Sequence, residues 1–455
     1  MTRSVVVGGG ISGLAGAWAL AGAGHDVVVL EAAPRLGGKI LTTDFDGRPV
    51  DEGPDAFLAR VPAAVDLCRE IGLDDLVSPA AGRAYLWLDG TLKAIPPGHV
   101  LGVPVDLEPI AKSGILSTLG LARASLEPRL PGAPLPAGVD VGVGELVRRR
   151  YGHEVLERLV DPLLGGINAG RSEELSIDVG AAQLAAAARR DASLTKALRA
   201  LRDAAPPADP TAPVFYAPAG GMGRLVDALV HALRDRGVEL STATAVEAIT
   251  RDGDRWEVRT VGGEVMAADR VLVTVPAFTA ARLLEPLSRR AAAVLSAVEY
   301  SSVALVTLAY PAGEVDLDGS GFLVPRIEGR LLTAGSVFSN KWPALGGAGT
   351  AIIRASVGRV GDERGLALDD GTLVERVHDE LVDALGMHFR PAAVRVSRWI
   401  RAFPQYRPGH LDRMAEAEAA LAEDAPGVAV TGAAARGVGI PTCIGAARAA
   451  AATLV

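Results

Sequence analysis

The chain has 455 residues, of which 49% are hydrophobic and 22% are charged, and its formal net charge at pH 7 is −8. This length predicts about three domain-sized units, and the composition excludes an intrinsically disordered chain. The acidic balance disfavours nucleic-acid binding, which requires a basic face. Cys68 and Cys443 are far apart in the sequence, so neither a disulfide scaffold nor a metal site is expected.

The sequence also bears on the cellular compartment. Val5 already belongs to the first predicted strand, so we predict no signal peptide. No uncharged apolar run reaches the ~20 residues that a membrane span requires. We therefore expect a cytoplasmic protein. Peripheral membrane contact stays open for the apolar stretch Leu107–Leu126, although core helices are the favoured interpretation.

The first forty residues carry the strongest motif. A short apolar run over residues 4–7 predicts a buried strand and leads directly into Gly8–Gly13, where three glycines have the spacing G-x-G-x-x-G. A helical pattern follows, and Val27–Leu30 predicts a second strand that ends at Glu31. The strand, glycine turn, helix and acid together form the context that a dinucleotide site requires.

Each position in this motif has a physical role. Gly8 permits the tight turn, Gly10 lets the backbone approach a pyrophosphate, and Gly13 lets the helix pack close to the strand. The first turn of the helix offers unpaired N–H groups to the phosphates. Glu31 stands where a carboxylate accepts hydrogen bonds from the adenosine ribose. We predict a bound dinucleotide.

The segment after the acid indicates which dinucleotide is bound. Arg35-Leu36-Gly37-Gly38-Lys39 supplies glycines through which a second loop could cover the phosphates. The longer run Glu31-Ala32-x-x-Arg35-x-Gly37-Gly38-Lys39 resembles the extended FAD fingerprint of the flavin amine oxidase superfamily. Nicotinamide dehydrogenases generally lack this extension, so the resemblance implies FAD.

Further elements follow in chain order. Hairpins are predicted around Asp46-Gly47 and Asp89-Gly90, and Asp203–Pro213 is the best linker candidate. Helices are predicted at Val61–Ile71, Gly144–Leu164, Ile177–Leu201, Arg224–Arg236 and Thr372–Leu385, and strands at Val238–Leu240, Ala245–Arg251, Trp256–Val261, Glu264–Ala267, Asp269–Val273, Ser302–Tyr310, Gly321–Pro325, Arg330–Gly335, Thr350–Val357 and Val394–Arg401.

The C-terminus repeats the pattern of a strand followed by a helix. Val428–Thr431 predicts a buried strand, and Val438-Gly439-Ile440-Pro441 opens a helix that runs to Thr453. A helix N-terminus flanked by glycine is a second place where negative charge is stabilised, here on a reduced flavin.

With these motifs the chain resembles the flavin-dependent protoporphyrinogen and coproporphyrinogen oxidases, and it is most similar to the soluble enzymes of Gram-positive bacteria. The resemblance covers nearly the whole chain. Its more specific blocks are Gly358-Arg359-x-Gly361-Asp362-Glu363, Pro404-Gln405-Tyr406-x-x-Gly409-His410 and Gly437-Val438-Gly439-Ile440-Pro441, and Gly53-Pro54-Asp55 and Asp161–Ile167 add to them.

The resemblance implies an α/β fold: a Rossmann-like FAD-binding domain of the amine oxidase superfamily type, a mixed-sheet substrate domain and a helical insertion. We predict that residues 1–80, 214–280 and 396–455 form the FAD domain. Residues 81–95 and 281–395 would form the substrate sheet. Residues 96–213 would form the helical insertion, which could face a membrane.

The resemblance also implies which residues bind FAD, without a covalent link. Beside the residues of the glycine motif, the resemblance implies residues that contact the ribose, residues near the phosphates, residues near the flavin ring and a backbone contact to the adenine end. Without the resemblance, Val246 and Trp399 would be read as core residues. The predicted set is Gly8, Gly9, Gly10, Ile11, Ser12, Gly13, Glu31, Ala32, Gly38, Lys39, Gly53, Pro54, Asp55, Ala56, Val246, Trp399, Val438, Gly439 and Ile440.

The substrate-site candidates rest on weaker signals. Propionate groups need cationic partners, and Arg60 and Arg171 are the candidates, although each could be a solvated surface charge. The resemblance implies that the Gly170 carbonyl orients the macrocycle. Asn168 stands where relatives often carry an aromatic residue, and Val61 where they often carry a basic one. His410 is a further candidate, with a structural role as the alternative.

The implied reaction is a six-electron oxidation of coproporphyrinogen III to coproporphyrin III in haem biosynthesis. FAD would take hydride in three rounds and pass electrons to O₂, giving hydrogen peroxide, so no protein base is assigned. Transient contact with the next enzyme of haem synthesis is expected. Protoporphyrinogen IX oxidase, amine oxidase, carotenoid desaturase, nicotinamide dehydrogenase and a tetrapyrrole-carrying module are the alternatives.

Overall fold

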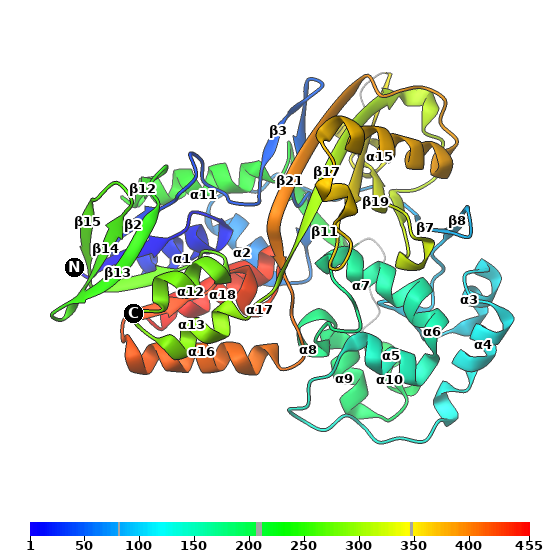
Figure 1. Ribbon diagram of the computed structural model, residues 1–455, viewed down its shortest axis with the longest axis horizontal. Coiled ribbons are helices and arrows are strands. Elements are labelled where there is room, and N and C mark those ends of the chain that lie inside the picture. The colour runs from blue at the N-terminus through cyan, green and yellow to red at the C-terminus, as the bar shows by residue number, and fades with distance from the viewer. Residues whose placement is uncertain (81, 206–211, 346–348) are drawn as a thin grey trace. The chain divides into compact units, whose positions relative to one another are not determined.

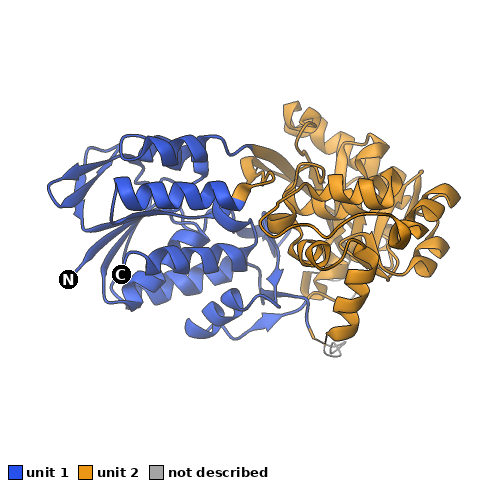
Figure 2. Cartoon of the chain, turned by 90° about the horizontal axis from the view of Figure 1, so that it is seen from below, with its two compact units in different colours: residues 1–78, 213–299, 411–455 blue, residues 79–212, 300–410 orange. Residues whose placement is uncertain are grey.

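The computed structural model describes residues 1–80, 82–205, 212–345 and 349–455 (Figure 1). The chain forms two compact units, each assembled from separate stretches of sequence (Figure 2). Unit 1 comprises Met1–Ser78, Pro213–Glu299 and Leu411–Val455, and unit 2 comprises Pro79–Ala212 and Tyr300–His410. Most of the predicted linker Asp203–Pro213 lies outside the described residues.

Unit 1 is built on a parallel five-stranded sheet in the order β12-β2-β1-β16-β22. The central strand β1 pairs with β2 and β16, as the Rossmann-like prediction requires. Val5 and Leu272 have no exposed surface, because both faces of such a sheet are covered. The strands are β1 (Arg3–Val7), β2 (Asp26–Leu30), β12 (Glu239–Ser241), β16 (Arg270–Val273) and β22 (Val428–Val430).

Smaller sheets complete the strands of unit 1. The predicted hairpin and meander are both present, and a short three-stranded sheet joins two sequence segments. These strands are β3 (Thr42–Phe45), β4 (Arg48–Asp51), β5 (Phe57–Leu58), β6 (Leu76–Val77), β11 (Phe215–Pro218), β13 (Val246–Asp252), β14 (Arg255–Thr260) and β15 (Val265–Ala268).

A polar and aromatic network connects four helices of unit 1. Trp18 Nε1 donates a 2.8 Å hydrogen bond to Glu70, which also accepts bonds of 2.7 and 3.0 Å from Arg448. The Arg236 guanidinium stacks 3.2 Å from the centre of the Trp18 ring. These residues belong respectively to α1 (Ile11–Gly22), α2 (Pro62–Glu70), α18 (Ile440–Ala452) and the C-terminal end of α11 (Gly223–Asp235).

Unit 2 contains a mixed seven-stranded sheet in the order β21-β17-β20-β19-β18-β7-β8. The β18–β7 pair is parallel and the other pairs are antiparallel. Two-residue strands β9 (His99–Val100) and β10 (Val103–Pro104) lie apart from it. The sheet strands are β7 (Ala84–Leu88), β8 (Thr91–Ala94), β17 (Tyr300–Pro311), β18 (Gly321–Leu323), β19 (Leu332–Val337), β20 (Thr350–Val357) and β21 (Ala393–Pro404).

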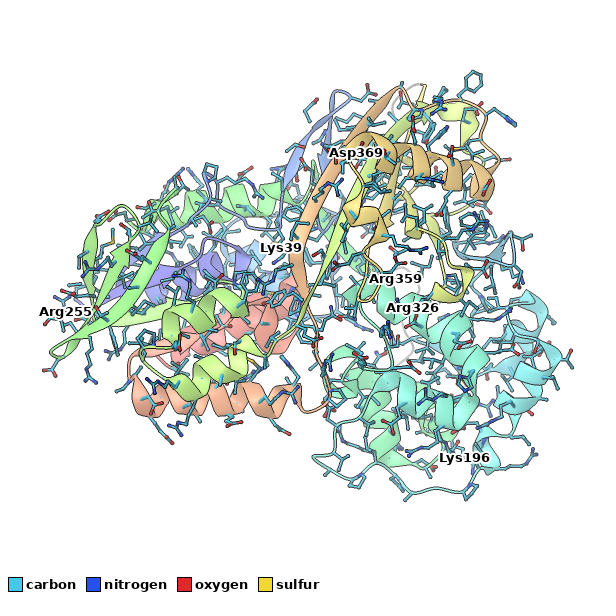
Figure 3. The ribbon with its side chains drawn as sticks, viewed as in Figure 1. Lys39, Lys196, Arg255, Arg326, Arg359 and Asp369 are labelled. Carbon is cyan, nitrogen blue, oxygen red and sulfur yellow. The ribbon has the colours of Figure 1, made fainter. Side chains whose placement is uncertain are left out.

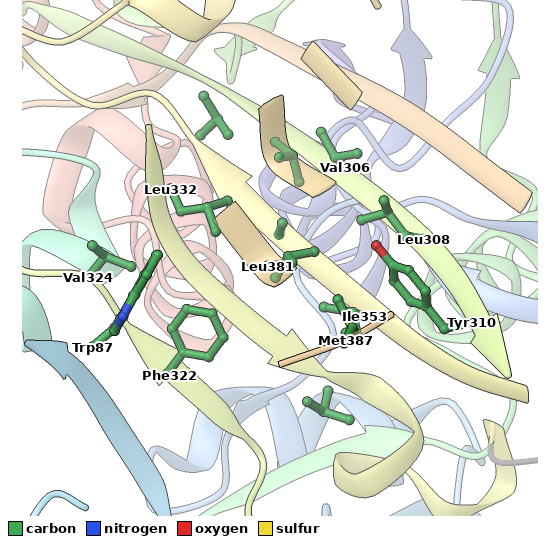
Figure 4. Packing of buried hydrophobic residues seen from close by; sticks show 14 of the residues in the cluster. Trp87, Val306, Leu308, Tyr310, Phe322, Val324, Leu332, Ile353, Leu381 and Met387 are labelled. Carbon is green, nitrogen blue, oxygen red and sulfur yellow. The ribbon is translucent and has the colours of Figure 1, made fainter. Parts of the chain in front are cut away.

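One face of this sheet packs against α15 (Asp370–Leu385) to form a hydrophobic core (Figure 4). Leu308 and Ile353 from the sheet and Leu381 from the helix have no exposed surface. Trp87 meets Phe322 edge to face, with ring centres 6.1 Å apart. Because one face of the sheet packs against this core, apolar and polar residues alternate along its strands, and this alternation predicted the strands from the sequence.

Helices make up the rest of both units. In unit 2 they are α3 (Leu107–Ser113), α4 (Thr118–Ser125), α5 (Val143–Tyr151), α6 (His153–Val155), α7 (Asp161–Asn168), α8 (Ile177–Gly180), α9 (Ala182–Arg190), α10 (Leu194–Ala204) and α14 (Phe338–Lys341). The other helices are α12 (Ala277–Leu284), α13 (Arg289–Ser296), α16 (His410–Asp424) and α17 (Ala433–Arg436), and the short 3₁₀ and π segments are η1 (Glu127–Arg129), η2 (Leu156–Val160), η3 (Ala312–Glu314), η4 (Arg326–Glu328), η5 (Pro343–Leu345) and η6 (Arg364–Ala367).

Two predicted helices are interrupted. The helix predicted at Gly144–Leu164 ends at Tyr151, because Gly152 takes a left-handed φ of +93°, and a π segment separates the following turns. The helix predicted at Ile177–Leu201 divides into three, and the last begins at its N-cap Ser193. Hydrophobic periodicity predicted the helical state correctly but not these breaks.

The boundaries of the units differ from the predicted domain boundaries. The predicted boundary at 281 falls inside α12, which belongs to unit 1. The predicted boundary at 396 falls inside β21, whose residues pair with β17 in unit 2. The predicted helical insertion and the mixed sheet share unit 2.

Candidate functional site

The glycine turn of unit 1 is fixed by backbone and threonine hydrogen bonds. Gly8 leaves β1 with a left-handed φ of +107°, and its N–H donates to the Leu30 carbonyl at 2.8 Å. The Thr274 hydroxyl lies 3.0 Å from the carbonyl oxygens of both Val7 and Gly8. The turn is therefore held from β1, β2 and the loop after β16.

Gly10 and Gly13 face different surroundings. A Cβ on Gly13 would overlap the Gly8 carbonyl oxygen, so only glycine allows α1 to begin this close to β1. A Cβ on Gly10 would meet only the Gly38 Cα, at 3.9 Å. Gly13 is thus required by packing, whereas the bare surface at Gly10 permits a phosphate to approach the backbone.

The N-terminus of α1 has no internal anion. Its N-cap is Gly10, no side chain caps it, and its first turn contains no acidic residue. The first N–H groups of any helix lack partners within the helix, and the helix dipole adds positive charge there. This end, with Ile11 and Ser12 in its first turn, could accept a phosphate.

Glu31 connects the end of β2 to the glycine turn. One carboxylate oxygen accepts a 2.6 Å hydrogen bond from the Gly9 N–H, and the other accepts one of 2.8 Å from the Ala33 N–H. Ala32 is exposed between them. A carboxylate has about four acceptor sites, so Glu31 retains acceptor capacity for a ribose hydroxyl.

The second glycine loop lies against the first. The Gly37 N–H donates to the Gly9 carbonyl at 2.8 Å, and Gly10 and Gly37 form an isolated parallel bridge. Arg35 organises the loop by donating to the Gly38 carbonyl at 2.6 Å. Gly38 itself has a left-handed φ of +58°. Two glycine-rich backbones therefore meet beside the N-terminus of α1.

Lys39 is half-buried and lies near the buried Cys443. No hydrogen bond or ion pair of the Lys39 ammonium occurs among the described residues, and burial lowers its pKa. The Cys443 thiol points at the Gly437 carbonyl, 3.5 Å away. Burial raises the pKa of this thiol to about 11, partly opposed by a hydrogen bond to Ser12 and by the Lys39 charge. A half-buried cation without a partner among the described residues, beside the glycine loops, suits an anionic ligand.

The C-terminal helix provides a second open N-terminus. The N-cap of α18 is Gly439, with no side-chain cap and no acid in the first turn. Val438 and Gly439 precede it on the surface, and Ile440 is buried at its start. α1 and α18 pack against each other, since Gly16 of α1 approaches the Ala447 carbonyl of α18. Both uncapped ends belong to unit 1.

The other predicted cofactor residues divide between the units. Gly53, Pro54, Asp55 and Ala56 follow β4 in unit 1, with Asp55 buried, and Val246 is buried at the start of β13. Trp399 instead lies on β21 in unit 2, opposite Val303. The structure thus brings the Gly8–Gly13, Glu31 and Lys39 groups together in one unit, and Trp399 belongs to the other.

The substrate-site candidates are also divided. Arg60 is exposed in unit 1, whereas Arg171 is exposed in unit 2. Asn168 is buried and donates to the Leu164 carbonyl at 3.0 Å. The Gly170 carbonyl accepts a 3.1 Å hydrogen bond from Arg326. His410 is 2% exposed and packs edge to face on Tyr406, which fits the structural role that the sequence left open.

Two arginines near Gly170 were not predicted as site residues. Arg326 donates to Gly170, and Arg359 is buried with an unpartnered Nε. Arg359 had a sequence signal, because it belongs to the Gly358–Glu363 block. Arg326 lies in no motif and could be found only from the fold.

The comparisons with known proteins identify the family. Residues 11–455 match the family described as flavin containing amine oxidoreductase. The chain belongs to this family. Coproporphyrinogen III oxidase of Bacillus subtilis is 34% identical over 452 residues, covering 97% of this chain and 95% of its own length. The protein of the same name from Mycobacterium bovis is 38% identical over 451 residues with the same coverage.

Solved structures confirm the predicted fold class. The crystal structure of an Exiguobacterium protein, provisionally described as a protoporphyrinogen oxidase, has a TM-score of 0.90 and 31% identity. It covers 100% of this chain, and this chain covers 98% of it. An engineered putrescine oxidase has a TM-score of 0.72 at 18% identity and shares the fold. Among the described residues, no helix has the length and apolar character to cross a bilayer.

Proposed function

We propose that the chain is an FAD-dependent oxidase that converts coproporphyrinogen III to coproporphyrin III, with O₂ reduced to hydrogen peroxide, in haem biosynthesis. The observation that carries the proposal is the similarity, across the whole chain, to relatives of that name at 34% and 38% identity. The glycine turn, the second loop and the two uncapped helix ends of unit 1 give this similarity a physical basis.

The residues present fit a dinucleotide flavin. Gly10 and Gly38 would leave room for the pyrophosphate beside the N-terminus of α1, and Glu31 would accept the ribose hydroxyls. The Lys39 ammonium would pair with the pyrophosphate, since no anionic partner for it occurs among the described residues. When bound, FAD supplies hydride acceptance and electron transfer to O₂.

A flavin held without a covalent bond fits the cysteine geometry. Cys68 and Cys443 are both free and buried, and burial raises the pKa of each thiol to about 11. The thiolate is the reactive form of cysteine, so neither side chain is prepared for attachment to flavin. The N-terminus of α18 would stabilise negative charge on a reduced flavin ring.

The remaining assignments complete the proposal. The protein acts in the cytoplasm, with transient contact to the next enzyme of haem synthesis, because porphyrins are apolar and photoreactive. No protein acid or base is assigned, since N–H protons lost on aromatisation can pass to water. Protoporphyrinogen IX is the alternative substrate, because a tobacco chloroplast enzyme named for that activity is 30% identical to this chain over 469 residues.

A single anaerobic experiment tests the flavin chemistry. The purified yellow protein is mixed with coproporphyrinogen III without O₂, and the flavin absorbance is followed. We expect rapid bleaching and no bleaching by putrescine, and denaturing the same sample should release all the flavin into the filtrate. A flavin that stays oxidised in coproporphyrinogen III, or that bleaches only in putrescine, would contradict the proposed reaction. A flavin retained by the polypeptide would contradict only non-covalent binding.

A further inference from the structure

Unit 2 holds a cluster of arginines that the flavin chemistry does not use. Arg326 begins η4, Arg359 follows β20, and Arg171 follows α7. Figure 3 labels Arg326 and Arg359, which are close enough for the Arg326 charge to act on Arg359. The segments after α7 and β20 are joined by the backbone, since the Val360 N–H donates to the Ala169 carbonyl at 2.9 Å, and the Arg326 side chain links η4 to both. We name Arg171, Arg326 and Arg359 the arginine cluster.

Arg359 is the unusual member of the cluster. It is only 8% exposed, yet its Nε has no hydrogen-bond partner among the described residues. Its one described hydrogen bond, from Nη1 to the Val324 carbonyl, is long at 3.5 Å. A guanidinium carries five N–H donors, and a buried charge without partners is costly. This side chain is therefore incompletely satisfied by the protein itself.

Arg326 and Arg171 place further positive charge beside Arg359. Arg326 is partly exposed and donates to the carbonyls of Val360 and Gly170, at 3.1 Å each. Arg171 is exposed, and the end of its guanidinium lies against Gly361, in space that a Cβ there would overlap. The cluster thus runs from the surface at Arg171 to the buried Arg359.

The acidic residues nearby are already engaged. Asp362 is bound through both oxygens by Arg364, at 2.8 and 2.9 Å. Asp161 accepts from the Ser172 N–H at 3.1 Å and lies 3.9 Å from Arg326. Arg326, Arg359 and Arg364 therefore share these two carboxylates. The Ser172 hydroxyl is also buried without a partner among the described residues.

Electrostatics agree with an excess of positive charge. Burial lowers the pKa of both Arg326 and Arg359, and neighbouring arginine charges lower it further, while the charges of Asp161 and Asp362 oppose the shift. An anion placed between these groups would compensate the buried positive charge and offset the repulsion between the arginines. A planar carboxylate matches the guanidinium fork, which accommodates two parallel N–H···O bonds.

We propose that the arginine cluster is a carboxylate-binding subsite that takes one propionate of the porphyrinogen substrate. The proposal rests on the proposed function and extends it, because it names how unit 2 recognises a substrate that carries several propionates. In this subsite the Gly170 carbonyl orients Arg326. Because Arg326 and Arg359 bind the propionate, they determine specificity for substrates that carry this group.

The test uses full-length, flavin-loaded protein and measures the Kd of coproporphyrin III by fluorescence quenching. The probe is compared with its tetramethyl ester, which has the same ring but no carboxylates. The variants are Arg326→Met and Arg359→Gln, and the matched control is Arg83→Met. Arg83 is an exposed arginine of unit 2 whose nearest carboxylate, Asp318, is 3.7 Å away.

We expect Arg326→Met to raise the Kd of coproporphyrin III by about 10-fold or more, since it removes a charge-assisted contact. The Kd of the ester and the flavin spectrum should not change, and Arg83→Met should bind both probes like the unchanged protein. Arg359→Gln should act in the same direction. If it fails to fold, Arg326→Met, which alters a partly exposed side chain, decides alone.

Two results would overturn the subsite in distinguishable ways. The variants could bind coproporphyrin III as tightly as the unchanged protein, or their affinities for coproporphyrin III and for its ester could fall by the same factor. Either result would show that the cluster is not a carboxylate site, while the proposed function would stand. If the unchanged protein binds neither probe and oxidises no porphyrinogen, both the subsite and the proposed function are wrong.

Discussion

At the scale of single residues, Gly10 and Gly13 separate the packing role of a glycine from its binding role. A Cβ on Gly13 would overlap the Gly8 carbonyl oxygen, whereas one on Gly10 would only approach Gly38. Gly10 has an ordinary φ of −73°, so alanine is allowed there by the backbone. The two positions therefore make a matched pair for mutation.

We predict that Gly13→Ala lowers the free energy of unfolding by about 1–3 kcal/mol, because the start of α1 must move away from β1. Gly10→Ala should change the stability of the flavin-free protein by less than about 1 kcal/mol and weaken FAD binding at least about 10-fold. Chemical denaturation and flavin titration measure these effects. Equal FAD affinity in Gly10→Ala and the unchanged protein would mean that the pyrophosphate lies elsewhere.

Single residues also mark the limit of sequence reading. Glu31 and the glycines were predictable because their spacing has one common physical use. Arg326 and Arg359 are 33 positions apart by their numbers, and an isolated arginine is usually a solvated charge. Only the fold shows that Arg326 donates to the Gly170 carbonyl. It also shows that Arg359 is buried and that its Nε has no partner among the described residues.

At the scale of elements, α15 illustrates how an N-cap residue sets the position at which a helix begins. Asp369, labelled in Figure 3, precedes the helix. Its carboxylate accepts a 3.0 Å hydrogen bond from the Thr372 N–H and one of 2.7 Å from the Thr372 hydroxyl. These bonds, the backbone one first, lower the pKa of Asp369. The ionised carboxylate is therefore the form that the folded state favours.

We predict that Asp369→Ala lowers the Tm at neutral pH. Since the folded pKa is depressed, the stabilisation is present above the unfolded pKa of about 3.9 and is lost as the pH falls through the folded value. The Tm difference between the two proteins should accordingly shrink in acid. Glu375→Ala, an exposed change in the same helix, is the control. A Tm difference that is constant across pH would show that the cap charge is not involved.

Elements also show which predictions depend on local signals. The buried strands of unit 1 were found because both faces of a parallel sheet are apolar. Helices α12, α13 and α16 were not predicted, although Ser288 accepts a 3.3 Å hydrogen bond from the Ala291 N–H as the cap of α13. The break at Gly152 was missed because helical periodicity continues on both sides of it.

At the scale of the whole molecule, unit 1 cannot form from one contiguous stretch. Its sheet takes β1 and β2 from the first segment, β12 and β16 from the second, and β22 from the third. The sequence predicted the three-segment FAD domain, but its edges at 281 and 396 differ from those of the unit. Domain boundaries depend on long-range strand pairing, such as that of β21 with β17, which local patterns do not encode.

The division of labour between cofactor and protein also explains why no side chain is assigned as a catalytic acid or base. The cofactor carries the redox chemistry in this class of enzyme, so the protein mainly binds and orients. Unit 1 contributes the uncapped helix ends and the glycine loops, and unit 2 contributes the arginine cluster. The identities of the cofactor and the substrate therefore define what this protein does, and a direct assay decides them.

The most direct test is an aerobic assay of purified, FAD-loaded protein with coproporphyrinogen III and protoporphyrinogen IX in parallel. Porphyrin fluorescence and hydrogen peroxide are recorded together. We predict that kcat/KM is at least about 10-fold higher for coproporphyrinogen III, because more propionates can reach cationic partners, and that peroxide rises in proportion to porphyrin. Preference for protoporphyrinogen IX would contradict the substrate assignment, and no turnover of either by FAD-loaded protein would contradict the proposed function itself.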